Sequence, residues 1–265
     1  MKTESAATPY AVYRDLGRMD YAEALAVQRR EFERLLQRKG AADADAGTIF
    51  TVEHPAVYTL GKNGAAANLL VSEELLRSSG AALCRTDRGG DITFHGEGQI
   101  VGYPVLDLER TGFGLRDYVE RIEQAVIETL AGYGIAAGRS SGASGVWLGE
   151  GAEMAVPQTP MAEMAVPQAT MAEMAVTQTT MAGTTGPLRK ICAIGVRASR
   201  YVAMHGFALN VTTDLSRFAL INPCGFTDRG VTSVEKELGY APPAGEIALK
   251  TVSRLAQLLG LELRV

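Results

Sequence analysis

Residues 88–108 read Arg-Gly-Gly-Asp-Ile-Thr-Phe-His-Gly-Glu-Gly-Gln-Ile-Val-Gly-Tyr-Pro-Val-Leu-Asp-Leu. Five glycines stand among apolar pairs that alternate as they do in β-strands. A glycine in a strand pattern usually marks a bulge, a sharp bend or a close approach of the backbone to a bound molecule. Polar residues stand next to these glycines: Arg88, Asp91, Thr93, His95 and Gln99. The stretch alone leaves two interpretations open, a glycine-rich hairpin whose polar residues face water or a binding site.

The whole chain is long enough to bury one sizeable core. It has 265 residues, of which 46% are hydrophobic, and length alone allows one or two domains. The net charge of −4 gives no reason to expect binding to nucleic acid or to a membrane surface. No apolar run reaches the roughly 18 residues of a membrane-spanning helix. The first residues lack the continuous apolar region of an export signal, so we expect a cytoplasmic protein.

Hydrophobic periodicity predicts three long helices, over residues 20–39, 115–133 and 247–259. We expect Asp20 to cap the first helix, together with Glu23 three residues later. A short helix is expected from Ser72 onward. Apolar runs predict strands over residues 48–52, 82–85, 92–105, 145–148, 191–196 and 205–211, and residues 54–61 are expected to form a turn followed by a strand.

The sequence changes character between Gly149 and Gly186. The unit Ala-Glu-Met-Ala-Val-Pro-Gln-Thr-Pro-Met and two near copies of it fill residues 152–181. A period of ten residues is not that of the common helical solenoids or propellers, and Pro157 and Pro167 would interrupt a helix soon after its start. We therefore predict an expanded, mostly disordered surface insertion at about 150–186. The alternative is a Met-rich stripe that serves a partner or a lid.

The three cysteines are odd in number and include no Cys-X-X-Cys pair, which suits a reducing compartment. Cys84 and Cys192 lie within apolar strand patterns and are interpreted as core residues. Cys224 follows Asn-Pro and precedes glycine, so its thiol is placed at a bend. Without further context, burial in the core is also the commoner fate of such a cysteine. The three histidines lie far apart with no ligand spacing, so no metal site is expected.

Four motifs, taken together and in this order, resemble the lipoyl(octanoyl) transferase family, the cofactor-independent branch of the biotin/lipoate ligase fold. They are residues 88–108, 189–197 (Arg-Lys-Ile-Cys-Ala-Ile-Gly-Val-Arg), 205–210 (His-Gly-Phe-Ala-Leu-Asn) and 222–225 (Asn-Pro-Cys-Gly). The resemblance extends from about Tyr13 to Lys236. It implies an α/β (α+β) fold, a central mixed β-sheet flanked by helices, in one catalytic domain over residues 1–265 that carries the repeat as an insertion.

The resemblance also implies the reaction. The family moves an octanoyl (or lipoyl) group from acyl carrier protein to the ε-amine of a lysine on lipoyl domains of 2-oxoacid dehydrogenase complexes and the glycine-cleavage H protein, and it needs no cofactor. Cys224 matches the family's nucleophile, which carries the acyl group as a thioester. Lys190 matches the lysine that lowers the pKa of this cysteine, because a cysteine attacks as its thiolate. Whether Lys190 acts as a base or only as a charge partner stays open.

A set of residues in three segments is implied to line the acyl and carbonyl site. Small residues among them suit a narrow slot for an alkyl chain. His95 is expected to position other groups rather than to act as the base, and a buried structural histidine is the alternative. Glu97, Phe94 and Asn222 depart from the family pattern, none of them in a catalytic role. The implied site residues are Arg88, Gly89, Gly90, Asp91, Ile92, Thr93, Phe94, His95, Ala193, Ile194, Gly195, Gly206, Phe207 and Ala208.

Two other functions are compatible with parts of this pattern. An ATP-using lipoate or biotin ligase of the same fold would activate a free acid as an adenylate and would need neither Cys224 nor Lys190. A non-catalytic binder of the acylated carrier protein would never become acylated itself. The dependence of the rate on ATP tests the first alternative, and the intact mass after mixing with octanoyl-carrier protein tests the second.

Overall fold

The computed structural model describes residues 8–154, 183–222 and 229–265. The centre of the molecule is a ten-stranded mixed sheet. The strands are β1 (Tyr10–Arg18), β2 (Asp45–Glu53), β6 (Gln99–Asp107), β7 (Gly138–Ser140), β8 (Ala143–Leu148), β9 (Glu153–Met154), β10 (Arg189–Ser199), β11 (Val202–Asn210), β12 (Gly230–Val231) and β13 (Glu262–Arg264). Their order is β13-β1-β2-β6-β11-β10-β8-β7-β9, and β12 pairs with β10 in parallel.

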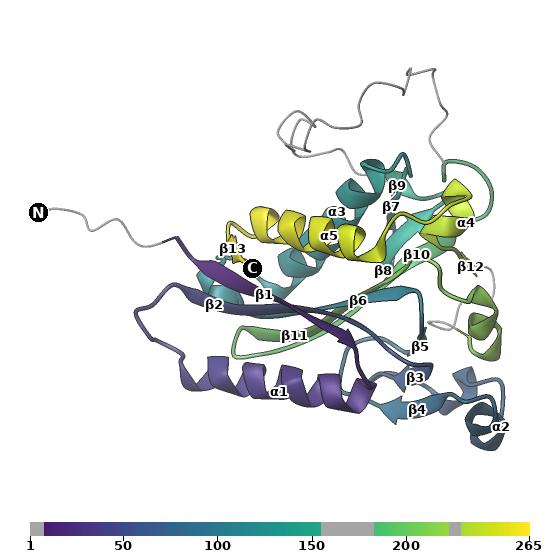
Figure 1. Ribbon diagram of the computed structural model, residues 1–265, viewed down its shortest axis with the longest axis horizontal. Coiled ribbons are helices and arrows are strands. Elements are labelled where there is room, and N and C mark those ends of the chain that lie inside the picture. Colours follow the sequence, from purple (N-terminus) through teal and green to yellow (C-terminus); the bar gives the residue numbers. More distant parts are fainter. Residues whose placement is uncertain (1–7, 155–182, 223–228) are drawn as a thin grey trace, which may run out of the picture.

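Three long helices cover the two faces of this sheet (Figure 1). Helices α3 (Leu115–Ala131) and α5 (Ala244–Leu258) pack on one face, where Ile122, Val126 and Leu255 join the largest hydrophobic cluster. Helix α1 (Tyr21–Gln37) packs on the opposite face, where Phe32 and Leu35 contribute to a second cluster. The expected central mixed sheet with flanking helices is therefore confirmed.

A second, three-stranded sheet of order β4-β3-β5 lies beside the large one. It consists of β3 (Val57–Leu60), β4 (Ala82–Arg85) and β5 (Ile92–His95), and it packs with α2 (Glu73–Ser78) around a third hydrophobic cluster. The remaining short elements are η1 (Ala66–Asn68), η2 (Leu108–Arg110), η4 (Leu215–Leu220) and α4 (Val234–Leu238). Among the described residues, no helix combines the length and hydropathy that crossing a membrane requires.

The glycine-rich stretch is not a hairpin, because its two strands belong to different sheets. β5 pairs with β3 in the small sheet, whereas β6 pairs with β2 and β11 in the large one. The chain crosses between the sheets at Gly96–Gly98. Gly98 has a φ of +75°, and a Cβ on it would overlap the hydroxyl of Thr212. The expectation of one strand pattern over residues 92–105 is thus corrected to two strands with a crossing between them.

The predicted helices are confirmed, but the expected cap of the first helix is wrong. The Asp20 side chain makes no capping hydrogen bond, whereas the Ser72 hydroxyl accepts a bond from the Leu75 amide at 3.2 Å at the start of α2. Periodicity missed β1, which carries charged residues on its exposed positions. It also missed the two- and three-residue strands, which are too short to form a pattern.

The described residues on either side of the repeat lie next to each other. The amide of Gly149 donates to the carbonyl of Gly183 at 2.7 Å, and that of Glu150 donates to Gly186 at 2.9 Å. The first repeat residues form β9, in which Glu153 pairs with Arg139 of β7. The predicted insertion lies otherwise outside the described residues, which stop at 154 and resume at 183.

Because these ends are already held together, we expect that residues 155–182 can be replaced by a short Gly/Ser linker. Closing a shorter loop costs little conformational entropy, so the melting temperature and the turnover should stay close to those of the unaltered chain, with turnover within about twofold. Calorimetry and a transfer assay check this. A matched replacement that also removes Glu153 and Met154 breaks the β7–β9 pairing and should lower the melting temperature. A large loss in the first variant would instead mean that the repeat is a folded lid or a docking surface.

Candidate active site

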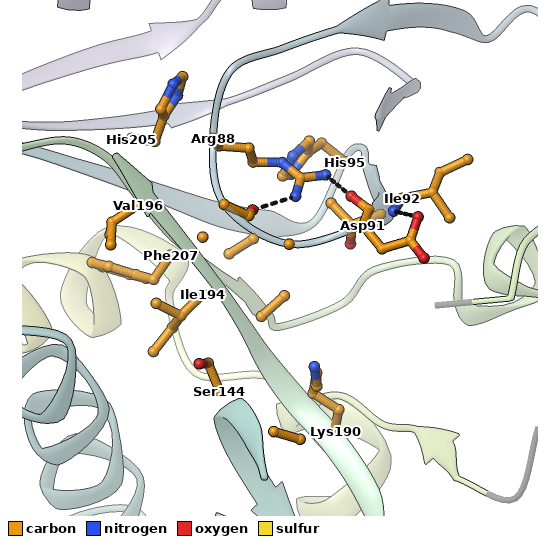
Figure 2. A pocket seen from close by; sticks show the side chains of 18 of the residues that line it. Arg88, Asp91, Ile92, His95, Ser144, Lys190, Ile194, Val196, His205 and Phe207 are labelled. Carbon is orange, nitrogen blue, oxygen red and sulfur yellow. Dashed lines mark hydrogen bonds between the residues drawn. The ribbon is translucent and has the colours of Figure 1, made fainter. Parts of the chain in front are cut away.

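A cavity of about 460 Å³ lies between the large sheet and the loop of residues 88–91 (Figure 2). Its volume is typical of sites for small molecules, which span about 300–1,000 Å³. All of the residues implied to form the acyl site line this cavity, except Phe94. Lys190 lines it as well. Cys224, together with Pro223 and Gly225, lies outside the residues that the structure describes.

Phe94 points away from the cavity, which corrects its assignment to the site. Neighbouring side chains on a strand point to opposite faces, so Phe94 and the cavity-lining Thr93 and His95 diverge. The Phe94 ring packs against Tyr58, with centroids 5.0 Å apart, and against Phe218 at 5.6 Å. It is a core residue of the small sheet.

The floor of the cavity is built from small residues of β10 and β11. The antiparallel register places Ala193 beside Ala208 and Gly195 beside Gly206. A Cβ on Gly195 would lie 2.8 Å from the carbonyl oxygen of Gly89, so the loop passes directly above this position. The pairing therefore leaves a strip of sheet with no bulky side chains beneath the loop.

The roof of the cavity is fixed by the buried side chain of Arg88. Its guanidinium donates to the carbonyls of Thr59 at 2.6 Å, Asp91 at 2.7 Å and Gly89 at 3.0 Å. The amide of Gly89 in turn donates to the carbonyl of Val196 on β10 at 3.0 Å. Arg88 thus acts as a structural clamp that holds the glycine loop against the sheet.

Asp91 braces the same loop from its outer side. Its carboxylate accepts bonds from the amides of Ile92 at 2.7 Å and Ala65 at 3.2 Å, and from the side-chain amide of Asn68. Because these bonds engage both carboxylate oxygens, Asp91 helps to fix the conformation of the loop.

Both ring nitrogens of His95 are engaged in hydrogen bonds. Nδ1 donates to the side-chain oxygen of Gln99 at 2.8 Å, so Nε2 accepts from the hydroxyl of Thr59 at 3.3 Å. Gln99 continues this chain by donating to Asn210 at 2.8 Å, and Asn210 donates to the carbonyl of Thr232 at 3.0 Å. The geometry favours a positioning role for His95 over that of a base.

Burial keeps this imidazole neutral. Burial, together with the nearby His54 and Arg88, lowers the pKa of His95 to about 3. The ring of Tyr21 stacks on His95 at a centroid distance of 5.9 Å. The wall of the cavity at this point is therefore polar but uncharged at neutral pH.

Two cations meet at one end of the cavity, on the ring of Trp147. The Nζ of Lys190 lies 4.5 Å from the ring centroid and the Cζ of Arg229 lies 5.3 Å from it, distances at which cations are attracted to an aromatic face. All three residues line the cavity. The neighbouring Arg189 forms an ion pair with Glu237 at 2.7 Å.

Cys192 is a core residue, as predicted, whereas Cys84 is half-buried and packs against the edge of the second cluster. Cys192 has no exposed surface and belongs to the largest cluster, and burial raises the pKa of its thiol far above the ordinary value. Burial also raises the pKa of Cys84. Neither thiol is suited to ionise at neutral pH. Within the described residues, no group of three or more histidine, cysteine or acidic side chains is arranged to hold a metal ion.

Several cavity residues were not predicted from the sequence. Trp147 had a usable signal, because it is the single tryptophan of the chain and stands on the strand before the repeat. His205 stands in the quoted motif of residues 205–210 but was given no role in the site. The other three gave no local signal, since they lie on α1, on β6 and beside the undescribed segment 223–228. The residues missed include Tyr21, Tyr103, Trp147, His205 and Arg229.

Comparison with known proteins finds relatives over most of the chain. Residues 20–256 match the profile of the lipoyl protein ligase A/B catalytic domain. An octanoyltransferase of Parabacteroides distasonis is 46% identical over 227 residues, which are 86% of this chain and 88% of the relative. An octanoyltransferase of Bacteroides thetaiotaomicron is 42% identical over 245 residues, which are 92% and 93% of the two chains.

A solved structure confirms the fold. The chain is similar to one from the structure of a bipartite lipoate protein ligase and its E2 lipoyl domain from Thermoplasma acidophilum, with a TM-score of 0.61 and 12% identity. The match covers 97% of this chain and 85% of the other. At this identity the likeness concerns the fold alone.

The neutral state of His95 predicts a pH dependence of stability. In the unfolded chain His95 takes up a proton near pH 6.5, whereas in the folded protein it does so only near pH 3. The unfolded state thus binds more protons between these values, and the free energy of unfolding falls as the pH drops from 6.5 toward 3. We expect His95→Gln to make this fall shallower, as measured by urea unfolding at several pH values.

Phe94→Leu is the matched control for this measurement. It changes packing one residue away without removing a titratable group, so it should lower stability at every pH and leave the slope as it is. An unchanged slope in His95→Gln would show that His95 is protonated in the folded protein.

Proposed function

We infer the reaction from the fact that this chain belongs to the octanoyltransferases of the lipoyl protein ligase A/B catalytic domain family. The proposed reaction transfers an octanoyl (or lipoyl) group from acyl carrier protein to the ε-amine of a lysine on lipoyl domains. The acceptors proposed are the 2-oxoacid dehydrogenase complexes and the glycine-cleavage H protein, and the compartment is the cytoplasm. The observation that carries the proposal is a slot with a floor of small residues that leads to a lysine.

The shape of the cavity supports an extended acyl chain as the ligand. Lys190 and Val196 both line it and lie six residues apart on β10, which corresponds to roughly 20 Å at about 3.3 Å per residue. The strip of Ala193, Gly195 and Ala208 lies between these ends. An alkyl chain on this strip would be covered by the glycine loop and shielded from water.

We propose Cys224 as the nucleophile of the transfer. Its thiolate attacks the carbonyl carbon of the donor thioester, a new carbon–sulfur bond forms, the bond to the carrier's sulfur breaks, and the carrier leaves as a thiolate that takes up a proton from water. The ε-amine of the acceptor lysine then attacks this acyl-enzyme, an amide forms, and the Cys224 thiolate leaves as the amine gives up a proton. The exchange of one thioester for another is nearly isoenergetic and amide formation is downhill, so the pair of steps needs no ATP.

Lys190 is proposed to favour the thiolate of Cys224. A cation near a cysteine lowers the pKa of the thiol and so increases the fraction that can attack. The position of the Lys190 ammonium at the cavity wall supports this role. The burial of Cys84 and Cys192 supports Cys224 by elimination, because both of these thiols are held in the protonated form.

The acyl-enzyme gives a direct test. With octanoyl-carrier protein alone, the protein should gain the mass of one octanoyl group, and added lipoyl domain should discharge it without ATP. Cys224→Ala should abolish the mass gain and lower turnover by more than a hundredfold. Lys190→Met should slow the loading step and move its pH profile upward, toward the ordinary thiol pKa of about 8.5.

Cys192→Ala is the matched control, because it removes a buried thiol from the strand that carries Lys190. It should lower stability and keep the mass gain. A label on Cys192, or undiminished turnover in Cys224→Ala, would overturn the mechanism. A requirement for ATP with free octanoate would point to a ligase.

The small residues of the floor lead to a prediction about the length of the acyl chain that the enzyme accepts. Ala208→Leu places a bulky side chain on the strip between β10 and β11 and should obstruct the middle of a long acyl chain. We expect kcat/KM for the octanoyl donor to fall at least tenfold, since single methylene contacts are worth about 1–3 kcal/mol. Transfer from a butyryl donor, measured in the same variant, should change less than threefold. An equal loss with both donors would mean that the chain does not pass over Ala208.

A further inference from the structure

The strand that carries Lys190 contains a β-bulge. In the pairing of β10 with β8, Lys190 lies opposite Trp147, whereas the next pair joins Cys192 to Val146, so Ile191 is the extra residue of the bulge. Ile191 and Cys192 both lack exposed surface and both belong to the largest hydrophobic cluster. In a regular strand two consecutive side chains point to opposite faces, and a bulge re-aims them. The bulge therefore lets Lys190 point into the cavity while the two residues after it stay in the core (Figure 2).

The stem of the Lys190 side chain lies against the backbone of β8. Gly145 has a φ of +119°, and a Cβ on it would lie 3.4 Å from the Cε of Lys190 and 2.5 Å from the carbonyl oxygen of Cys192. Helix α3 holds this backbone in place, because the Glu123 carboxylate accepts a bond from the Gly145 amide at 2.9 Å. The methylene groups of Lys190 therefore follow a narrow path that the missing side chain of Gly145 leaves open.

The ammonium at the end of this stem lies on the ring of Trp147. Its Nζ is 4.5 Å from the ring centroid, within the range of a cation–π contact. The ring itself is fixed, because Trp147 is 1% exposed and its Nε1 donates to the carbonyl of Ala143 at 3.2 Å. A lysine side chain is flexible and carries a compact charge. A fixed aromatic face is therefore a surface that selects one of its rotamers.

Charged side chains from the neighbouring elements surround this position. Arg229, next to β12, lies on the same ring, with its Cζ 5.3 Å from the centroid. Two like charges repel each other, so the attraction of the Trp147 face offsets the presence of Arg229 beside Lys190. The other charged groups on α3, β7, α4 and β10 form two ion pairs with each other, Glu123–Arg139 and Glu237–Arg189.

We propose that Trp147 is a positioning residue, which holds the Lys190 ammonium at one end of the cavity and thereby lets Lys190 favour the thiolate of Cys224. This inference rests on the proposed function. Without the ring, the lysine side chain keeps its charge but spends less time in the rotamer that places it there. The effect of removing the ring is therefore smaller than that of removing the lysine, and it vanishes when the lysine is absent.

The rate at which iodoacetamide alkylates Cys224 tests this proposal without a carrier protein. Peptide mapping by mass spectrometry separates Cys224 from the other two cysteines, and the thiolate is the form that reacts. The rate at pH 7 is divided by the rate at pH 10, where a thiol with the ordinary pKa of about 8.5 is ionised, so that differences in access to the thiol cancel. We expect Trp147→Leu to lower this ratio about threefold, the size of one cation–π contact, and Lys190→Met to lower it further.

Three further variants separate the aromatic face from packing. Trp147→Phe keeps a ring beside Lys190 and should keep the ratio within about twofold. Trp147→Met fills the space with a flexible apolar side chain and gives the same reading as Trp147→Leu, should that variant fail to fold. Val146→Ala is the matched control, because it removes buried surface from the same strand. It should lower the melting temperature and leave the ratio unchanged.

A double-mutant cycle decides whether Trp147 acts through Lys190. Trp147→Leu should lower the ratio in the unaltered chain and in Arg229→Met, but should have no further effect in Lys190→Met. An equal effect of Trp147→Leu with and without Lys190, or an unchanged ratio in Trp147→Leu, would overturn the inference and leave the proposed function standing. An unchanged ratio in Lys190→Met would show that the role proposed for Lys190 is wrong, and the inference would fall with it.

Discussion

The buried guanidinium of Arg88 holds together the part of the structure on which the cavity depends. A buried charge is tolerated only when it is well supplied with hydrogen-bond partners, and Arg88 finds carbonyl oxygens on β3 and on its own loop. These bonds turn a stretch with two adjacent glycines into a fixed roof. The bond from Gly89 to Val196 then joins this roof to the large sheet. The small sheet and the large sheet are therefore connected above the cavity as well as by the chain that crosses between them.

The polar side chains along one wall of the cavity are neutral, whereas the charged groups of Arg88 and Asp91 in the roof are engaged by hydrogen bonds within the loop and to β3. His95 and His54 are kept neutral by burial, and the chain of bonds from Thr59 through His95 and Gln99 to Asn210 satisfies the polar side chains along one wall. Lys190 and Arg229 supply positive charge at one end. The wall that carries His95 therefore presents neutral polar groups to the cavity, and the two cations lie at one end of it.

The small residues of the floor show how pairing converts a sequence into a binding surface. Gly195 and Gly206 are eleven residues apart in the chain, yet the hairpin register sets them side by side. Each is bounded from a different direction, Gly195 by the roof loop and Gly206 by the backbone of Gly102. A larger side chain at either position would push the roof or the neighbouring strand away. The width of the slot thus follows from backbone contacts of this strand pair with the roof loop and with the neighbouring strand β6.

Periodicity and composition determined the long helices, most of the long strands and the interpretation of Cys192 as a core residue, because these depend on the spacing of apolar side chains along a local segment. The motif pattern also selected Lys190 and a set of site residues that, except for Phe94, the structure gathers around one cavity. The sequence could not show that the glycine stretch crosses between two sheets, and so that Phe94 faces a different core from Thr93. It also could not bring Asp87 to His205 or Arg229 to Trp147, pairs that lie more than 80 residues apart. Only the tertiary structure decided these contacts, since they depend on the register of strands and on the backbone at His205, where φ is +63°, and neither leaves a local pattern in the chain.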